Sequence, residues 1–103
     1  MGEEQVMKKV KQSLEEEIDV KELYLFGSRA KGTFREDSDY DIAVVSNDFA
    51  SKSFRDRQEI VLDKVREVIN DKPVEVLCYT PEEFEKGKNG FIPEIIDREG
   101  IRT

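Results

Sequence analysis

The sequence contains no histidine and a single cysteine, Cys78, in 103 residues. A disulfide framework, or a zinc site built from cysteine and histidine within one chain, is therefore excluded, and a reduced, cytoplasmic setting is expected. Catalysis by a serine–histidine or cysteine–histidine pair is excluded for the same reason. Any catalytic chemistry in this chain must come from other side chains.

Positive charge and long apolar segments are also scarce. The 24 acidic residues outnumber the 17 basic ones, so the net charge is −7 and the pI is about 4.7. Nonspecific binding of DNA or RNA needs a basic surface, so direct nucleic-acid binding is not expected. No apolar stretch approaches the ~20 residues of a membrane span, so no membrane association is expected. An acidic protein can still bind a nucleotide if metal ions screen its phosphates.

Apolar residues recur at helical spacing in some segments and form short strand-like runs in others. The segment DYDIAVV (39–45) is apolar on both faces in its second half, which predicts a central strand. Helices are predicted over residues 3–17, 29–32, 54–70, 81–86 and 91–98, and strands over residues 21–26, 39–45 and 74–79. This order predicts one α/β (α+β) domain over residues 1–103, with a small mixed sheet of three or more strands and helices packed against it.

Two helix starts carry recognisable capping residues. Ser28 is predicted to be the N-cap of the short helix that follows it, and Gly32 to end that helix. Thr80 and Glu83 have the spacing of a capping box around a helix that begins at Pro81.

Acidic residues crowd the segment REDSDYD, just before the apolar run. Asp39 and Asp41 are two residues apart in a predicted strand, so their side chains project from the same face. Two carboxylates at that spacing can converge on a cation, and Mg²⁺ prefers hard oxygen ligands. A simple polar entry to the strand is the alternative. Glu36 and Asp37 are assigned to a solvated turn.

Gly27 and Ser28 lie where a predicted strand meets a predicted helix. Free backbone N–H groups at such a junction suit phosphate oxygens, and glycine permits close approach of a ligand. An ordinary capped helix is the alternative.

Glu75 is the only acid within the predicted strand VEVLCY (74–79). If that strand lies beside residues 39–45, Glu75 can face the same site as the two aspartates. Three carboxylates on adjacent strands can hold two metal ions. The alternative is an edge-strand acid that points to solvent.

Gly27-Ser28, ten intervening residues and Asp39-Tyr40-Asp41 together resemble the Gly-Ser-x10-Asp-x-Asp signature of the DNA polymerase beta-like nucleotidyltransferases. The layout GSRAKG…SDYDIAVV…PVEVLCYTPEEF is similar to that of the minimal nucleotidyltransferases, the MntA-like antitoxins encoded beside HEPN-domain proteins. The resemblance implies a polymerase beta-like core.

The resemblance also implies roles for individual residues. Gly27 and Ser28 would bind the β- and γ-phosphates of the incoming nucleotide. Asp39 and Asp41 would hold both Mg²⁺ ions, and Glu75 would take the third acidic place, where many relatives have aspartate. Arg29 matches a basic place in the signature, either as a phosphate contact or as a structural ion pair.

The leading hypothesis is therefore an enzyme that moves NMP, most readily AMP from ATP, to a hydroxyl group. The chain has little room for an acceptor-binding domain, so the acceptor is expected on a partner, by resemblance a HEPN-domain toxin. The first alternative is a non-catalytic antitoxin or subunit that binds and blocks this partner. The second is a structural divalent-ion domain. The sequence leaves the nucleotide base and the oligomeric state open, a homo-oligomer included.

Overall fold

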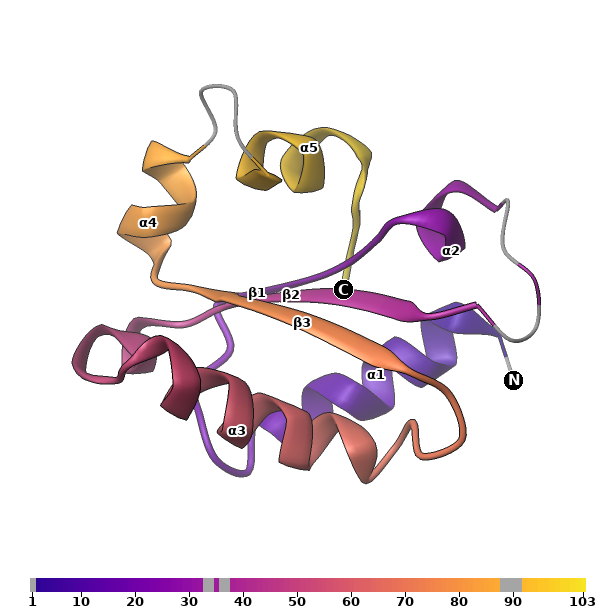
Figure 1. Ribbon diagram of the computed structural model, residues 1–103, viewed down its shortest axis with the longest axis horizontal. Helices are drawn as coiled ribbons and strands as arrows, with labels where there is room; N and C mark the ends of the chain where they lie inside the picture. Colours follow the sequence, from indigo (N-terminus) through magenta and orange to yellow (C-terminus); the bar gives the residue numbers. More distant parts are fainter. Residues whose placement is uncertain (1, 33–34, 36–37, 88–91) are drawn as a thin grey trace.

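The computed structural model describes residues 2–32, 35, 38–87 and 92–103 (Figure 1). The predicted solvated turn at Glu36 and Asp37 lies outside these residues. The helices of the structure are α1 (Glu3–Leu14), α2 (Ser28–Lys31), α3 (Phe54–Arg66), α4 (Pro81–Lys86) and α5 (Ile92–Glu99), with a 3₁₀ turn, η1, over Asn47–Ser51. Its strands are β1 (Glu22–Phe26), β2 (Tyr40–Val45), β3 (Val74–Tyr79) and β4 (Ile101–Arg102).

The strands form one mixed sheet in the order β3-β2-β1-β4. Strand β1 is antiparallel to both β2 and β4, whereas β2 and β3 are parallel. The sequence prediction of a small mixed sheet with helices is confirmed. Strand β3 lies beside β2, which is the condition under which Glu75 can face the same site as the two aspartates. Strand β4 was not predicted, because two residues are too few to show any alternation.

Both faces of the sheet are covered (Figure 1). Ile42 and Val44 of β2 point into the larger core, which they share with residues of α1 and α3. Ala43 and Val45 point the other way, into a smaller core with Phe84 of α4 and Ile96 of α5. The expectation that β2 is central and apolar on both faces is confirmed.

Two long helices are shorter than predicted. Helix α1 ends at Leu14 rather than at residue 17, and α3 ends at Arg66 rather than at residue 70. Beyond each end the backbone turns more tightly: the N–H of Glu17 bonds to the carbonyl of Leu14, and the N–H of Val68 to that of Val65. These i to i−3 bonds are typical of a fraying last turn.

The helix-start predictions had different outcomes. The capping box of Thr80 and Glu83 is confirmed. The prediction that Ser28 is an N-cap is wrong: Gly27 takes that position and Ser28 is the first helical residue. The reason is the backbone at Gly27, whose φ of 74° and ψ of −154° favour glycine. Gly32 ends the helix as predicted, with a left-handed φ of 75°.

The only cysteine of the sequence, Cys78, lies on β3 in the larger core. Burial raises the pKa of its thiol to about 12. At neutral pH the thiol is therefore protonated and unreactive.

A buried arginine joins α3 to its surroundings. Arg57 Nε donates to the carbonyls of Phe49 and Lys52, at 3.0 and 3.2 Å. Its two terminal nitrogens donate to the carboxylate of Glu83, at 2.7 and 3.2 Å. The arginine also holds the pKa of Glu83 below its usual range, chiefly through this hydrogen bond.

Arg57→Met is expected to lower the free energy of unfolding by about 1–3 kcal/mol. The reason is that the carbonyls of Phe49 and Lys52 lose their hydrogen-bond donor and the Glu83 carboxylate loses its ion-pair partner. Denaturant titration measures the change. The control is Arg55→Met on the same helix, whose side chain is 87% exposed and pairs only with Glu59 among the ion pairs of the described residues. The control should change stability by less than about 0.5 kcal/mol. Equal effects of the two substitutions would refute a structural role for Arg57.

Candidate active site

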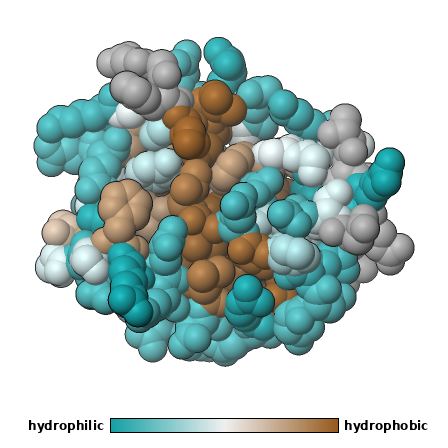
Figure 2. All heavy atoms as spheres, viewed as in Figure 1, coloured by the Kyte–Doolittle hydropathy of each residue, from teal (hydrophilic) through white to brown (hydrophobic). Residues whose placement is uncertain are grey.

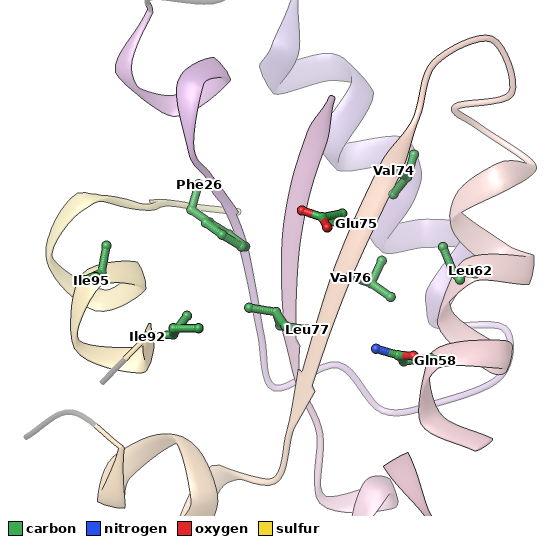
Figure 3. Close-up of a pocket in the computed structure, with 9 residues that line it drawn as sticks. All are labelled: Phe26, Gln58, Leu62, Val74, Glu75, Val76, Leu77, Ile92 and Ile95. Atoms are coloured by element: carbon green, nitrogen blue, oxygen red, sulfur yellow. The ribbon is translucent and has the colours of Figure 1, made fainter. Parts of the chain in front are cut away.

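Three side chains form a row across one face of the sheet. Asp41 on β2 is the register partner of Phe26 on β1 and of Glu75 on β3. Cross-strand partners project from the same face, so the two carboxylates are direct neighbours. Figure 3 shows the Glu75 carboxylate directed from β3 toward β2. Because β3 lies beside β2, Glu75 faces Asp41, as the sequence analysis expected for that arrangement. Strand β3 is nevertheless an edge strand, and Glu75 is exposed.

The environment of Asp41 disfavours its negative charge. Partial burial, a hydrogen bond with Glu75 and the charges of Glu75 and Asp39 raise the pKa of Asp41 to about 6, from a usual value of 3.8. Carboxyl groups this close cannot all ionise without strong repulsion. A cation placed between them would remove that repulsion.

The raised pKa of Asp41 predicts a pH-dependent stability in the absence of divalent cations. The folded protein binds the Asp41 proton more tightly than the unfolded chain does, so the proton stabilises the folded state. This stabilisation is complete below about pH 4 and is lost as the pH rises through about 6. Between about pH 4 and pH 7, the free energy of unfolding of Asp41→Asn should therefore rise by on the order of 1 kcal/mol relative to that of wild type, after allowance for the partial exposure of Asp41. Thermal melts in EDTA measure the difference. A constant difference across this range would contradict the prediction.

The carboxylates suit a divalent cation by their chemistry but are not assembled into a full ligand set. Among residues 2–32, 35, 38–87 and 92–103, no group of three or more His, Cys, Asp or Glu side chains is arranged to hold a metal ion. The close pair is Asp41 and Glu75. Asp39 lies one residue before β2 and is exposed, and its negative charge contributes to the raised pKa of Asp41. Hard oxygen atoms and an excess of negative charge nevertheless fit Mg²⁺ better than a softer metal.

Gly27 lies directly against Asp41. A Cβ atom at Gly27 would overlap the Oδ2 atom of Asp41. The position therefore requires glycine for two reasons, the positive φ and the contact with the carboxylate. The structure thus brings Gly27 next to Asp41, and Ser28 follows it as the first residue of α2.

Arg29 points into the protein. Its side chain is 2% exposed and forms an ion pair with Glu3 of α1 at 3.2 Å. Of the two roles considered for Arg29, the structural ion pair is the one seen here, and a phosphate contact stays a prediction.

An apolar hollow of about 610 Å³ lies beside Glu75. It is lined by Phe26, Gln58, Leu62, Val74, Glu75, Val76, Leu77, Ile92 and Ile95 (Figure 3). Ile92 and Ile95 of α5 are 50% and 46% exposed. Figure 2 shows a band of hydrophobic side chains across this face, bordered by hydrophilic ones.

Sequence reasoning did not identify Phe26 or Leu77 as part of the site. Phe26 faces Asp41 only because of the antiparallel register of β1 and β2. Leu77 follows Glu75 by two residues on the same strand, so that alternation could have placed it on the same face.

The described helices include none that is both long and apolar enough to cross a membrane.

Comparison with solved structures defines the class of fold. A Sulfolobus solfataricus protein described as a nucleotidyltransferase has a TM-score of 0.67 and 20% identity, and the match covers 95% of this chain and 76% of that one. A toxin–antitoxin crystal structure with AMP-PNP has a TM-score of 0.64 and 22% identity, over 92% and 69% of the two chains. BolA1 from Arabidopsis thaliana has a TM-score of 0.59 and 18% identity, over 76% and 94%. At these identities the likeness shows the fold alone, and one fold can host unrelated functions.

The family follows from the sequence itself. Residues 7–102 match the model of the nucleotidyltransferase domain, so the chain belongs to the nucleotidyltransferase domain family. No curated protein is significantly similar to it.

Proposed function

We propose that the chain is a Mg²⁺-dependent nucleotidyltransferase that moves NMP, most readily AMP from ATP, to a hydroxyl group of a partner protein. The observation that carries the proposal is the pairing of Asp41 with Glu75 and the contact of Gly27 with Asp41, in a chain of the nucleotidyltransferase family. Because Gly27 has no Cβ atom, the Asp41 carboxylate packs directly against the strand–helix junction where the phosphates are proposed to bind.

The residues divide between two tasks. Asp39, Asp41 and Glu75 would hold Mg²⁺, which when bound supplies positive charge for the phosphates and for the attacking oxygen. Gly27 and Ser28 would bind the β- and γ-phosphates. The acceptor hydroxyl oxygen forms a bond to the α-phosphorus and loses its proton. The bond between the α-phosphorus and the oxygen that bridges it to the β-phosphorus breaks, and pyrophosphate leaves with that oxygen. Orientation of the two reactants supplies much of the rate enhancement.

The acceptor side of the site is the hollow beside Glu75. Its apolar lining and the half-exposed isoleucines Ile92 and Ile95 suit contact with a protein surface. We propose that the partner is a toxin, of the HEPN type by resemblance, and that AMP on its hydroxyl neutralises it. The fold likeness to a toxin–antitoxin structure with AMP-PNP supports this choice.

The test is transfer of label from α-³²P-ATP to a candidate partner protein, with and without Mg²⁺. The expected result is a labelled partner and one pyrophosphate released per label. GTP, CTP and UTP in parallel determine the base preference. A tight complex with the partner that forms without label, at every nucleotide, would rule out the enzyme.

A second candidate function, a non-catalytic antitoxin that blocks its partner by contact, is supported by a specific observation. The three predicted carboxylates do not form one metal-binding group among the described residues, and Glu75 is exposed. This candidate predicts inhibition of the toxin without ATP. The enzyme predicts inhibition that requires ATP and persists after the two proteins are separated.

A further inference from the structure

We infer that Arg29 is a positioning residue that holds Asp39 in place for divalent-cation binding, and is not a ligand of the nucleotide phosphates. The inference rests on the proposed function, since it takes Asp39 as one of the carboxylates of the site. It assigns to Arg29 a role that acts through Ser38 and Tyr40.

Asp39 and Asp41 are fixed by different means. Asp41 lies within β2 and is paired on both sides, with Phe26 and with Glu75. Asp39 precedes the first residue of β2, and the nearest bond to a neighbouring strand is made by the next residue, from the Tyr40 N–H to the carbonyl of Pro73 at 3.0 Å. The position of its backbone depends on Ser38 and Tyr40, the residues that flank it.

Arg29 contacts both flanking residues. Its Nε and one terminal nitrogen donate to the carbonyl oxygen of Ser38, at 3.1 and 2.8 Å. Its guanidinium carbon lies 4.0 Å from the centre of the Tyr40 ring, which is within the range of a cation–π contact. One planar group thus contacts the residues on both sides of Asp39, through the backbone carbonyl of Ser38 and the side-chain ring of Tyr40.

Arg29 is itself held from behind by α1. Its other terminal nitrogen donates to Glu3 Oε1 at 3.2 Å. The second oxygen of Glu3 is buried, and the carboxylate also interacts with the Tyr40 hydroxyl. Burying these charged groups costs free energy, which the ion pair and the Ser38 bonds offset. The network therefore joins α1, α2 and the entry of β2.

The same contacts argue against a phosphate role. Each of the three guanidinium nitrogens already donates to a protein oxygen, and the side chain is 2% exposed. These bonds use three of the five guanidinium N–H groups, so it is chiefly the burial of the side chain that keeps a phosphate away from Arg29.

The test separates cation binding from nucleotide binding. Mn²⁺ affinity of the partner-free protein is measured by electron paramagnetic resonance, and ATP affinity is measured in EDTA. Arg29→Lys keeps the charge but loses the planar fork that bonds the Ser38 carbonyl twice. It is expected to weaken Mn²⁺ binding by about 10–100-fold, as loss of a group that orients a metal ligand does, and to leave ATP binding in EDTA unchanged.

Two further variants keep the inference falsifiable. Glu3→Gln removes the ion pair of Arg29 from outside the site, and is expected to weaken Mn²⁺ binding by a smaller factor, even if Arg29→Lys fails to fold. Lys31→Met is the matched control: it removes a positive charge from the same helix, where Lys31 pairs with Glu99 at 3.5 Å, and should leave Mn²⁺ affinity unchanged.

The outcomes distinguish this inference from the proposed function. Normal Mn²⁺ affinity in folded Arg29→Lys or Glu3→Gln overturns the inference, as does weaker ATP binding in EDTA. Wild-type protein that binds Mn²⁺ but transfers no AMP overturns the proposed function and leaves the role of Arg29 standing.

Discussion

Asp41→Asn is expected to abolish AMP transfer, with a fall in rate of at least about 10²–10³-fold, while the protein stays folded. Asp41 is the carboxylate that contacts both Gly27 and Glu75. The amide keeps the shape of the side chain but removes the charge that would bind a cation. Loss of one preorganised electrostatic group commonly costs this much in rate. The measurement is label transfer from α-³²P-ATP at saturating Mg²⁺.

Two controls make the Asp41 result interpretable. Asp63→Asn, an exposed change of the same type on α3, should leave transfer unchanged. The melting temperature of Asp41→Asn at pH 7 without metal should equal or exceed that of wild type, because a repelled charge is removed. Substantial transfer by folded Asp41→Asn would show that this carboxylate does not take part in the reaction.

Gly27→Ala is expected to lose both stability and activity. The added Cβ meets the Asp41 carboxylate, and alanine is strained at a φ of 74°. Together these effects should cost about 1–3 kcal/mol, or a fall in melting temperature of roughly 5–15 °C. Transfer should fall as well, because Asp41 must move to make room. Thermal melts and the label-transfer assay measure the two effects.

The chain offers a matched control for this glycine. Gly32 has nearly the same φ, 75°, but nothing lies within 4 Å of a Cβ built there. Gly32→Ala should therefore show the strain alone, about 1 kcal/mol, with transfer retained. Combining Gly27→Ala with Asp41→Gly should recover part of the lost stability, since contacting residues do not behave additively. Equal losses of activity in the two alanine variants would contradict a specific role for the Gly27–Asp41 contact.

The fold was largely predictable because the pattern of apolar residues is local. β2 shows it best: its apolar run needs cover on both faces, and α1 and α3 lie on one side with α4 and α5 on the other. Helix ends were less predictable, because the last turns of α1 and α3 depend on i to i−3 bonds that the pattern does not show.

The site was predictable only in part. Alternation placed Asp41 and Glu75 on one face only on the condition that their two strands are neighbours, and the sequence left that condition open. The contact of Arg29 with Glu3 spans 26 positions in the sequence, and nothing in either local segment indicates it. The place of Phe26 depends on the register of β1 against β2, which the sequence does not reveal.

The buried thiol of Cys78 makes this chain well suited to site-specific spectroscopy. The sequence contains no other cysteine, and this one is protected from thiol reagents at neutral pH. A cysteine introduced at Ile95 would therefore be the one site that maleimide dyes modify. Fluorescence from that position would report directly whether a partner covers the hollow beside Glu75, before any chemistry takes place.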